Sequence, residues 1–187
     1  RAALFAQNVR LTGDVAVSFS DGFENYRITR SHLYLLKREY PDLISYPDKD
    51  FFVQSASAGS LGIIRHFLWS DPEAEYGAAM KTETLYYEEG QWFIHKSARY
   101  SLAAKGGHND EPHNHNDIGS FILTKNGEQI LCDPGTGTYC REYFSDGRYT
   151  FFRTSSRGHS VPIINGQYQK EGRTHEASAS FSEDVFT

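Results

Sequence analysis

Hydrophobic positions follow two different periods along this chain. In roughly the first 78 residues they recur at the spacing of a helix face, most clearly over 31–40 and 57–69. The first of these predicted helices stops before Pro41, because proline disfavours a helical conformation in the residue that precedes it. Ser20-Asp21-Gly22, upstream of both, is typical of a turn. These helices are too few to close a domain by themselves, so they predict the end of a helical domain that begins upstream.

From about residue 79 the pattern changes to short alternating runs that are divided by turn residues. Asn126-Gly127 lies between two such runs, which is a strong signal for a two-residue β-hairpin. Short strands at regular spacing predict an antiparallel β-sandwich. The runs cover 84–87, 92–95, 98–103, 119–124, 129–132, 161–164 and 177–181.

The predicted fold class is therefore mainly β. We expect residues 1–78 to be the C-terminal part of an α-helical domain and residues 79–187 to form an antiparallel β-sandwich. The chain begins at Arg1 without an initiator Met, and a strand pattern still runs at Thr187. We therefore expect a piece of a longer protein, with the sandwich truncated.

Composition and charge narrow the classes of partner. The chain is 39% hydrophobic and 14% aromatic, which favours a folded, β-rich or carbohydrate-handling protein over a disordered one. The net charge of -5 argues against general nucleic-acid binding. No apolar run approaches the ~20 residues that cross a bilayer. We expect neither a nucleic-acid partner nor a membrane partner.

One basic patch interrupts this acidic chain. Arg141, Arg148, Arg153 and Arg157 fall within 17 residues. Guanidinium groups bind carboxylates and sulfates well, so the patch could meet an anionic ligand. Arginines on a solvated strand face explain the same pattern equally well.

Two cysteines, Cys132 and Cys140, are too few for a disulfide scaffold. They could pair across the turn between them, but we expect two free, mostly buried thiols. The cellular compartment therefore stays open.

Three short motifs carry candidate chemistry: His113-Asn114-His115-Asn116-Asp117, Cys132-Asp133-Pro134-Gly135 and Gly158-His159-Ser160. On a β-strand His113 and His115 would project from the same face, as two metal ligands or as one ligand beside a catalytic base. His115, Asp133 and His159 offer a nitrogen, oxygen and nitrogen set that Zn²⁺ accepts. A buried polar cluster without metal is the alternative.

The H-x-H pair matches the opening of a cupin motif from Gly107 onward, but the expected Glu and the second cupin motif are missing. A wider match is more specific. The runs HNHNDIGSFIL, KNGEQILCDPGTGTY and RTSSRGHSVPIINGQ resemble the sandwich domain of heparinase II/III-like polysaccharide lyases. The upstream helices resemble the end of the (α/α) toroid that precedes the sandwich in that family.

The resemblance implies a lyase that cleaves a uronate-containing acidic polysaccharide by β-elimination. It implies that His113 is the catalytic imidazole, for which a pKa near 6.5 is suitable. It also implies Zn²⁺ at His115, Asp133 and His159. The substrate-binding candidates are Arg141, Arg148, Arg153 and Tyr139.

Other roles remain open at this stage. Asn114, Asn116 and Asp117 could orient the imidazoles or shape a turn. In the family, the catalytic Tyr and the residue that neutralises the uronate come from the toroid, and we expect them upstream of Arg1. A homodimer of the full-length protein is a further expectation. The alternatives are a non-catalytic, metal-containing carbohydrate-binding module and a cupin-like metal enzyme.

Overall fold

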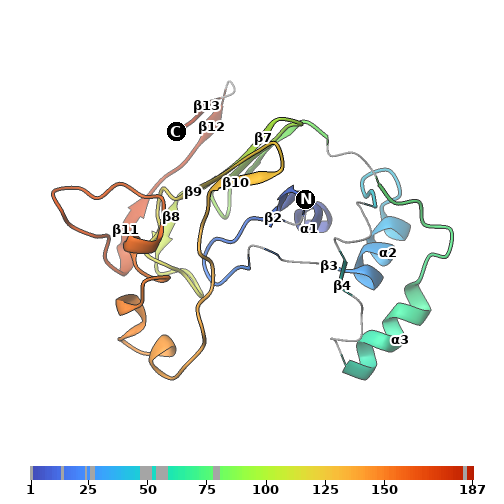
Figure 1. Ribbon diagram of the computed structural model, residues 1–187, viewed down its shortest axis with the longest axis horizontal. Helices are drawn as coiled ribbons and strands as arrows, with labels where there is room; N and C mark the ends of the chain where they lie inside the picture. Colours follow the sequence, from blue (N-terminus) through green and yellow to red (C-terminus); the bar gives the residue numbers. More distant parts are fainter. Residues whose placement is uncertain are drawn as a thin grey trace.

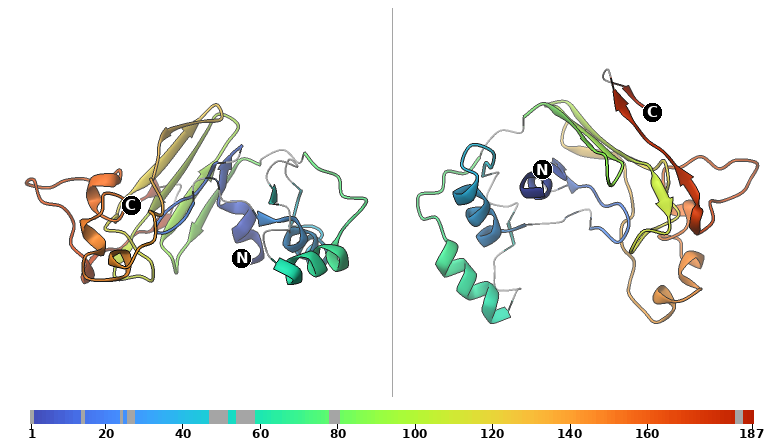
Figure 2. Two further views of the ribbon diagram at one scale, coloured as in Figure 1. Left: turned by 60° about the horizontal axis from the view of Figure 1, so that its bottom comes forward. Right: turned by 180° about the vertical axis from the view of Figure 1, so that it is seen from behind.

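The computed structural model describes residues 2–13, 15–23, 25, 28–46, 52–53, 59–77, 81–182 and 185–187. An antiparallel sheet occupies the middle of the molecule, and helices α2 (Arg30–Glu39) and α3 (Gly59–Trp69) lie to one side of it (Figure 1). The long loops between β10 and β11 lie on the other side. Figure 2 shows the same division from two further directions.

Five antiparallel strands form the main sheet in the order β10-β9-β7-β6-β5. The Asn126-Gly127 hairpin is confirmed, because Lys125 of β9 pairs with Glu128 of β10 and both loop residues have a left-handed φ, 51° and 87°. A type I′ turn requires this geometry. The strands are β5 (Glu83–Tyr87), β6 (Trp92–Lys96), β7 (Tyr100–Lys105), β9 (Phe121–Lys125) and β10 (Glu128–Leu131).

The described part of the chain also holds four short strand pairs, three of them antiparallel. Among the described strands only β3 and β4 pair in parallel. The pairs are β1 (Arg10–Thr12) with β2 (Val15–Ala16), β8 (Gly107–Asn109) with β11 (Gly172–Ala177), β12 (Phe181–Ser182) with β13 (Val185–Phe186), and β3 (Ile28–Thr29) with β4 (Phe52–Val53).

Both faces of the sheet are covered, as alternation along β6 requires. Ile94 is fully buried and packs with Leu11 of the N-terminal segment. Its neighbour Phe93 points to the opposite face, where its ring stacks on Phe186 at a centroid distance of 4.9 Å. Each buried side chain of this size contributes roughly 1.5–3 kcal/mol. The mainly β, antiparallel sandwich is confirmed.

The helical part has a core of its own. Helix α1 (Ala2–Asn8) precedes the strands, and α2 packs with Leu33 and Tyr34 against Ile44 and Tyr46. The helix predicted over 31–40 is confirmed within a residue. The second is confirmed from Gly59 onward, while positions 57 and 58 lie outside the described residues. The division at 78/79 and the toroid stay predictions.

Two strand predictions near the C-terminus are wrong. Residues 161–164 form no strand, because Pro162 has no N–H to donate and Ile164 makes a single bridge to Gln167 across a turn. The run 177–181 is not continuous either, since β11 ends at Ala177 and β12 begins at Phe181.

The two cysteines are free, as expected, but the prediction of buried thiols is wrong. Cys132 and Cys140 are both exposed. Asp133 is fully buried at the start of the loop between them. Asp133 is held inside by hydrogen bonds, since its carbonyl accepts from Ser18 Oγ at 3.0 Å and its Oδ1 from the Gly135 N–H at 2.9 Å, and the neighbouring thiol stays at the surface. Within the described residues, no helix is long and apolar enough to span a membrane.

Candidate active site and metal-binding cluster

His113 and His115 do not share a strand face, and this prediction is wrong. They lie in the loop between β8 and β9. His113 has a left-handed φ of 61°, and the Asn114 N–H donates to the Glu111 carbonyl at 3.1 Å. This turn breaks the alternation of side chains that a strand would impose. The two imidazoles nevertheless approach one carboxylate, that of Asp21.

The three polar residues between and after the histidines hold this loop. Asp117 Oδ1 accepts a hydrogen bond from Lys105 Nζ at 2.9 Å, and both side chains are buried. The Asn116 N–H donates to the Thr154 carbonyl at 2.9 Å. Asn114 Oδ1 accepts from a tyrosine hydroxyl, that of Tyr149, at 2.7 Å. These residues therefore fix the position of the imidazoles through the loop that carries them.

Asp21 is the centre of the site, and its side chain is only 7% exposed. It belongs to the turn that follows β2. Its Oδ2 accepts from His113 Nδ1 at 2.8 Å and from the Tyr139 hydroxyl at 2.9 Å. Its Oδ1 accepts from His115 Nε2 at 3.1 Å, from the Tyr143 hydroxyl at 3.0 Å and from Arg148 Nη2 at 3.0 Å.

Sequence reasoning missed Asp21 as a site residue. An Asp between Ser and Gly is ordinary in a turn. Nothing in the spacing connects this turn with the His113 loop. The basic and aromatic residues that meet at Asp21 come from separate parts of the chain, so only the tertiary structure reveals the cluster.

The Asp21 carboxylate is ionised across the ordinary pH range. Burial by itself would raise its pKa, but the hydrogen bonds from His113, His115, Tyr139 and Tyr143 lower the pKa of Asp21 to about 2. An ionised carboxylate only accepts hydrogen bonds. His113 Nδ1 and His115 Nε2 must therefore both carry protons in these contacts.

His115, Asp133 and His159 come together from three parts of the chain. One ligand atom of each lies within 4.8 Å of the others. The His115 and His159 rings lie 5.2 Å apart, and His159 Nδ1 lies 2.8 Å from Asp133 Oδ2. The predicted ligand set is therefore a spatial cluster.

The protonation states in this cluster suit a metal ion. His159 Nε2 lies 2.8 Å from the Arg153 carbonyl, which can only accept, so the proton is on Nε2 and Nδ1 can be a ligand. His115 Nε2 donates to Asp21, and its Nδ1 is buried with no hydrogen-bond partner in the described part of the chain. Histidines that bind metals commonly donate their second nitrogen to a carboxylate or carbonyl in this way.

Electrostatics also suit a cation between these residues. Burial lowers the pKa of His115 to about 4, so this imidazole is neutral, as a ligand must be. Burial acts in the same direction on His159, but the hydrogen bond with Asp133 and its charge raise the pKa of His159. Asp133 and His159 thus share either a proton or a metal cation.

The predicted substrate-binding residues are placed very differently. Tyr139 is 51% exposed and lies beside Asp21. Arg141 is exposed on the same loop. Arg153 is exposed and bonds the carbonyls of Pro134 and Thr136. Arg148 is the exception, since its side chain is 11% exposed and its guanidinium bonds Asp21, stacks on Tyr143 and reaches carbonyls of the His113 loop.

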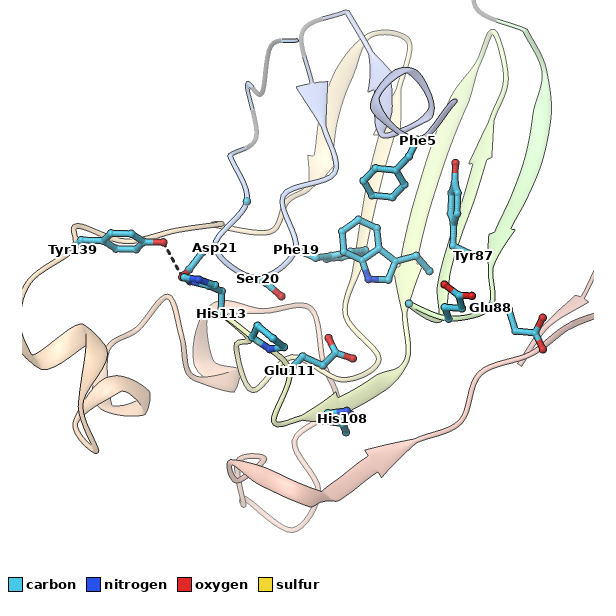
Figure 3. A pocket seen from close by; sticks show the side chains of 15 residues that line it. Phe5, Phe19, Ser20, Asp21, Tyr87, Glu88, His108, Glu111, His113 and Tyr139 are labelled. Atoms are coloured by element: carbon cyan, nitrogen blue, oxygen red, sulfur yellow. Dashed lines mark hydrogen bonds and ion pairs between the residues drawn. The ribbon is translucent and has the colours of Figure 1, made fainter. Parts of the chain in front are cut away.

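His113 lines two adjoining pockets, of about 1190 and 490 Å³, and Glu111 lines both as well. The His113 side chain is 60% exposed. Figure 3 shows His113, Asp21 and Tyr139 gathered at one end of the larger pocket, with Phe5, Phe19 and Tyr87 at the other. A long substrate lying across both pockets would pass His113.

Solved structures with a similar fold include two of heparinase III. One, the BT4657 gene product with methylated lysines, has a TM-score of 0.56 and 14% identity over 96% of this chain. Another heparinase III crystal structure has a TM-score of 0.55 and 17% identity over 92% of this chain. The chain spans 25% of the length of each, and at this identity the likeness shows the fold alone.

No curated protein matches the chain. The family described as "Heparinase II/III-like, C-terminal" matches residues 79–181, which is more than half of the 187 residues. That stretch holds the main sheet, the His113 loop and all three members of the metal-binding cluster. The chain therefore belongs to the heparinase II/III-like family.

Proposed function

We propose that the chain is part of a polysaccharide lyase that cleaves a uronate-containing acidic polysaccharide by β-elimination. His113 transfers the proton. The observation that carries this proposal is its geometry: the imidazole is open to two pockets while its Nδ1 is tied to a buried carboxylate. This leaves Nε2 with the lone pair, as a general base needs.

The chemistry of β-elimination suits this site. The proton on C5 of a uronate becomes acidic when the neighbouring carboxylate is neutralised. His113 Nε2 removes that proton, the bond from C4 to the glycosidic oxygen breaks, and a C4–C5 double bond forms. The leaving oxygen takes a proton from an acid. The Tyr139 hydroxyl donates to the same Asp21 oxygen as His113 Nδ1. The aromatic ring of Tyr139 therefore lies beside the proposed base, where it can pack against a sugar ring.

We assign Zn²⁺ to His115, Asp133 and His159. Two imidazole nitrogens and one carboxylate oxygen are a common zinc donor set, with a fourth position for water or another group. When bound, the ion would tie the His113 loop to two distant loops and so shape the site. His113 keeps its proton-transfer role outside this set, since its Nδ1 bonds Asp21.

Arg141 and Arg153 are the proposed contacts for anionic groups of the substrate. Both are exposed, Arg141 two residues after Tyr139 and Arg153 at a small pocket that Gly22 also lines. Arg148 we propose as a partner of Asp21, since its side chain is only 11% exposed and its guanidinium bonds that carboxylate. The guanidinium of Arg153 bonds two backbone carbonyls, but that residue is exposed.

Residues 1–78 we propose as the end of a helical toroid domain. The exposed apolar side chains of α3 support a helical neighbour, namely Leu61, Ile64, Phe67 and Leu68. A homodimer of the full-length protein stays a prediction.

The cluster membership argues against the cupin-like alternative. A cupin-like enzyme would use both His113 and His115 as ligands, whereas the described cluster holds His115 alone of this pair. The non-catalytic carbohydrate-binding module would bind the same polysaccharide as the lyase without cleaving it, so only an activity assay separates these two alternatives.

The decisive experiment incubates the full-length protein with heparan sulfate, alginate and oligouronides, and follows the ultraviolet absorbance of the 4,5-unsaturated product. Absorbance that grows with time on at least one of them supports the lyase. Binding without absorbance on any of them would favour the non-catalytic module instead.

A further inference from the structure

One carboxylate joins the two functional halves of the site. Asp21 Oδ2 bonds His113, the proposed base, and Asp21 Oδ1 bonds His115, a member of the metal-binding cluster. Neither imidazole has its second nitrogen on this carboxylate. The two histidines therefore face Asp21 with opposite nitrogens, Nδ1 for His113 and Nε2 for His115.

This contact determines which nitrogen of each ring holds the lone pair. An ionised carboxylate accepts on both oxygens, so each histidine must donate to it. His113 then keeps the lone pair on Nε2. His115 keeps it on Nδ1, which is buried without a hydrogen-bond partner among the described residues and is thus left for a metal ion beside Asp133 and His159. In the opposite tautomers the base would lose its free nitrogen and the metal site would lose a ligand.

The turn that carries Asp21 is held firmly. Ser18 Oγ donates to the Asp133 carbonyl at 3.0 Å, and the Thr136 N–H donates to the Gly22 carbonyl at 2.9 Å. Phe19 is 2% exposed in the core of the sheet. A Cβ at Gly22 would lie 2.9 Å from the Phe19 carbonyl oxygen, so this close turn requires glycine. Anchoring of this kind pre-organises a site.

We propose that Asp21 is a positioning residue that sets the tautomers of His113 and His115 together, so that the proton-transfer site and the metal site depend on one carboxylate. The inference rests on the proposed function for its catalytic half. Its structural half, the two tautomers, stands on the geometry of the Asp21 contacts alone.

The first test is Asp21→Asn in the full-length protein, with Asp42→Asn as the matched control at an exposed turn. An amide accepts through its oxygen but donates through its nitrogen, so it can serve only one of the two imidazoles. We expect kcat to fall ~10²–10⁴-fold with a much smaller change in KM. We expect Zn²⁺ affinity to fall ~10–100-fold.

Asp21→Glu keeps the carboxylate, so its kcat should lie between those of Asp21→Asn and the wild type. If Asp21 served only for packing, the longer Glu side chain would give no such recovery. A kcat for Asp21→Asn within about threefold of the Asp42→Asn control, in an enzyme that is active, would overturn the catalytic half.

The second test needs neither activity nor a folded Asp21 variant. Long-range proton–nitrogen NMR of the wild-type imidazoles, above the ordinary histidine pKa of ~6.5, reports the tautomers directly. We expect His113 with its proton on Nδ1 and His115 with its proton on Nε2, the signals being assigned with His113→Gln. The opposite tautomer at His113 would overturn the proposal even if Asp21→Asn fails to fold.

These outcomes separate the two proposals. If wild-type protein yields unsaturated product from no polysaccharide, the lyase assignment fails, and the tautomers still decide the role of Asp21. If the enzyme is active but His113 has the opposite tautomer, only the Asp21 inference fails.

Discussion

Two histidines of one motif occupy opposite environments. His113 is 60% exposed at the mouth of two pockets, whereas the His115 side chain is fully buried beside Asp133 and His159. Exposure leaves one imidazole able to exchange a proton with a substrate. Burial keeps the other neutral and ready to be a ligand. Identical side chains thus acquire different chemistry from their surroundings, and the comparison predicts that each can be disabled separately.

The largest expected effect is on catalysis alone. His113→Ala removes the proposed base, and kcat/KM should fall ~10²–10⁴-fold, as measured by product absorbance. Metal content and thermal stability should stay at wild-type values, because His113 lies outside the metal-binding cluster. If His113→Ala also loses the metal, the division of roles is wrong and the cupin-like arrangement gains support.

A change in the Lys105–Asp117 ion pair, which holds the loop of both histidines, should weaken the proton-transfer site and the metal-binding cluster together. Lys105→Met leaves the Asp117 carboxylate buried and without its close cation, which typically costs ~3–5 kcal/mol. Urea unfolding measures this loss, with Lys125→Met at an exposed hairpin position as the control. The double variant Lys105→Met with Asp117→Asn should recover part of the stability. Equal stability of Lys105→Met and the control would mean that this pair does not hold the loop.

The metal region should fail by itself in His159→Ala. Zinc at about one hundred times its Kd stabilises a folded protein by ~2.7 kcal/mol, and the variant should lose this gain. Metal analysis and unfolding with and without added zinc measure both effects. Stoichiometric zinc retained in His159→Ala would remove this residue from the ligand set.

The smallest effect should be confined to the open region. Tyr139→Phe removes one hydrogen bond to Asp21, worth ~0.5–1.5 kcal/mol, and should lower kcat/KM about two- to tenfold. The free energy of unfolding should fall by no more than the same ~0.5–1.5 kcal/mol, because the half-exposed ring keeps its packing. A loss as large as that of His113→Ala would instead place Tyr139 in the proton transfer.

Local signals in the sequence predicted most of the regular structure. Asn126-Gly127 specified its hairpin because both positions tolerate a left-handed φ. The apolar spacing before Pro41 predicted α2 almost to the residue. The strand predicted over 161–164 was wrong. The β-branched residues beside Pro162 are typical of a strand, but they pair with no neighbouring strand among the described residues.

The candidate site was likewise predicted only in part from the sequence. The types and order of residues were enough to single out His113, His115, Asp133 and His159, because few side chains bind metals or carry protons near neutrality. The exposure and the hydrogen-bond partners of these four residues could not be predicted from the sequence, since both depend on contacts between distant segments. Arg148 shows this well: its sequence neighbours suggest a substrate contact, while its position shows a partner of Asp21.

The sequence by itself determined which chemical groups are present and which short elements form, because propensity, turn chemistry and side-chain reactivity are local properties. Only the tertiary structure decided that a turn residue, Asp21, meets both histidines of a loop far along the chain. Proton positions on an imidazole depend on what the ring touches, and that contact exists only once the N-terminal segment packs on the sheet.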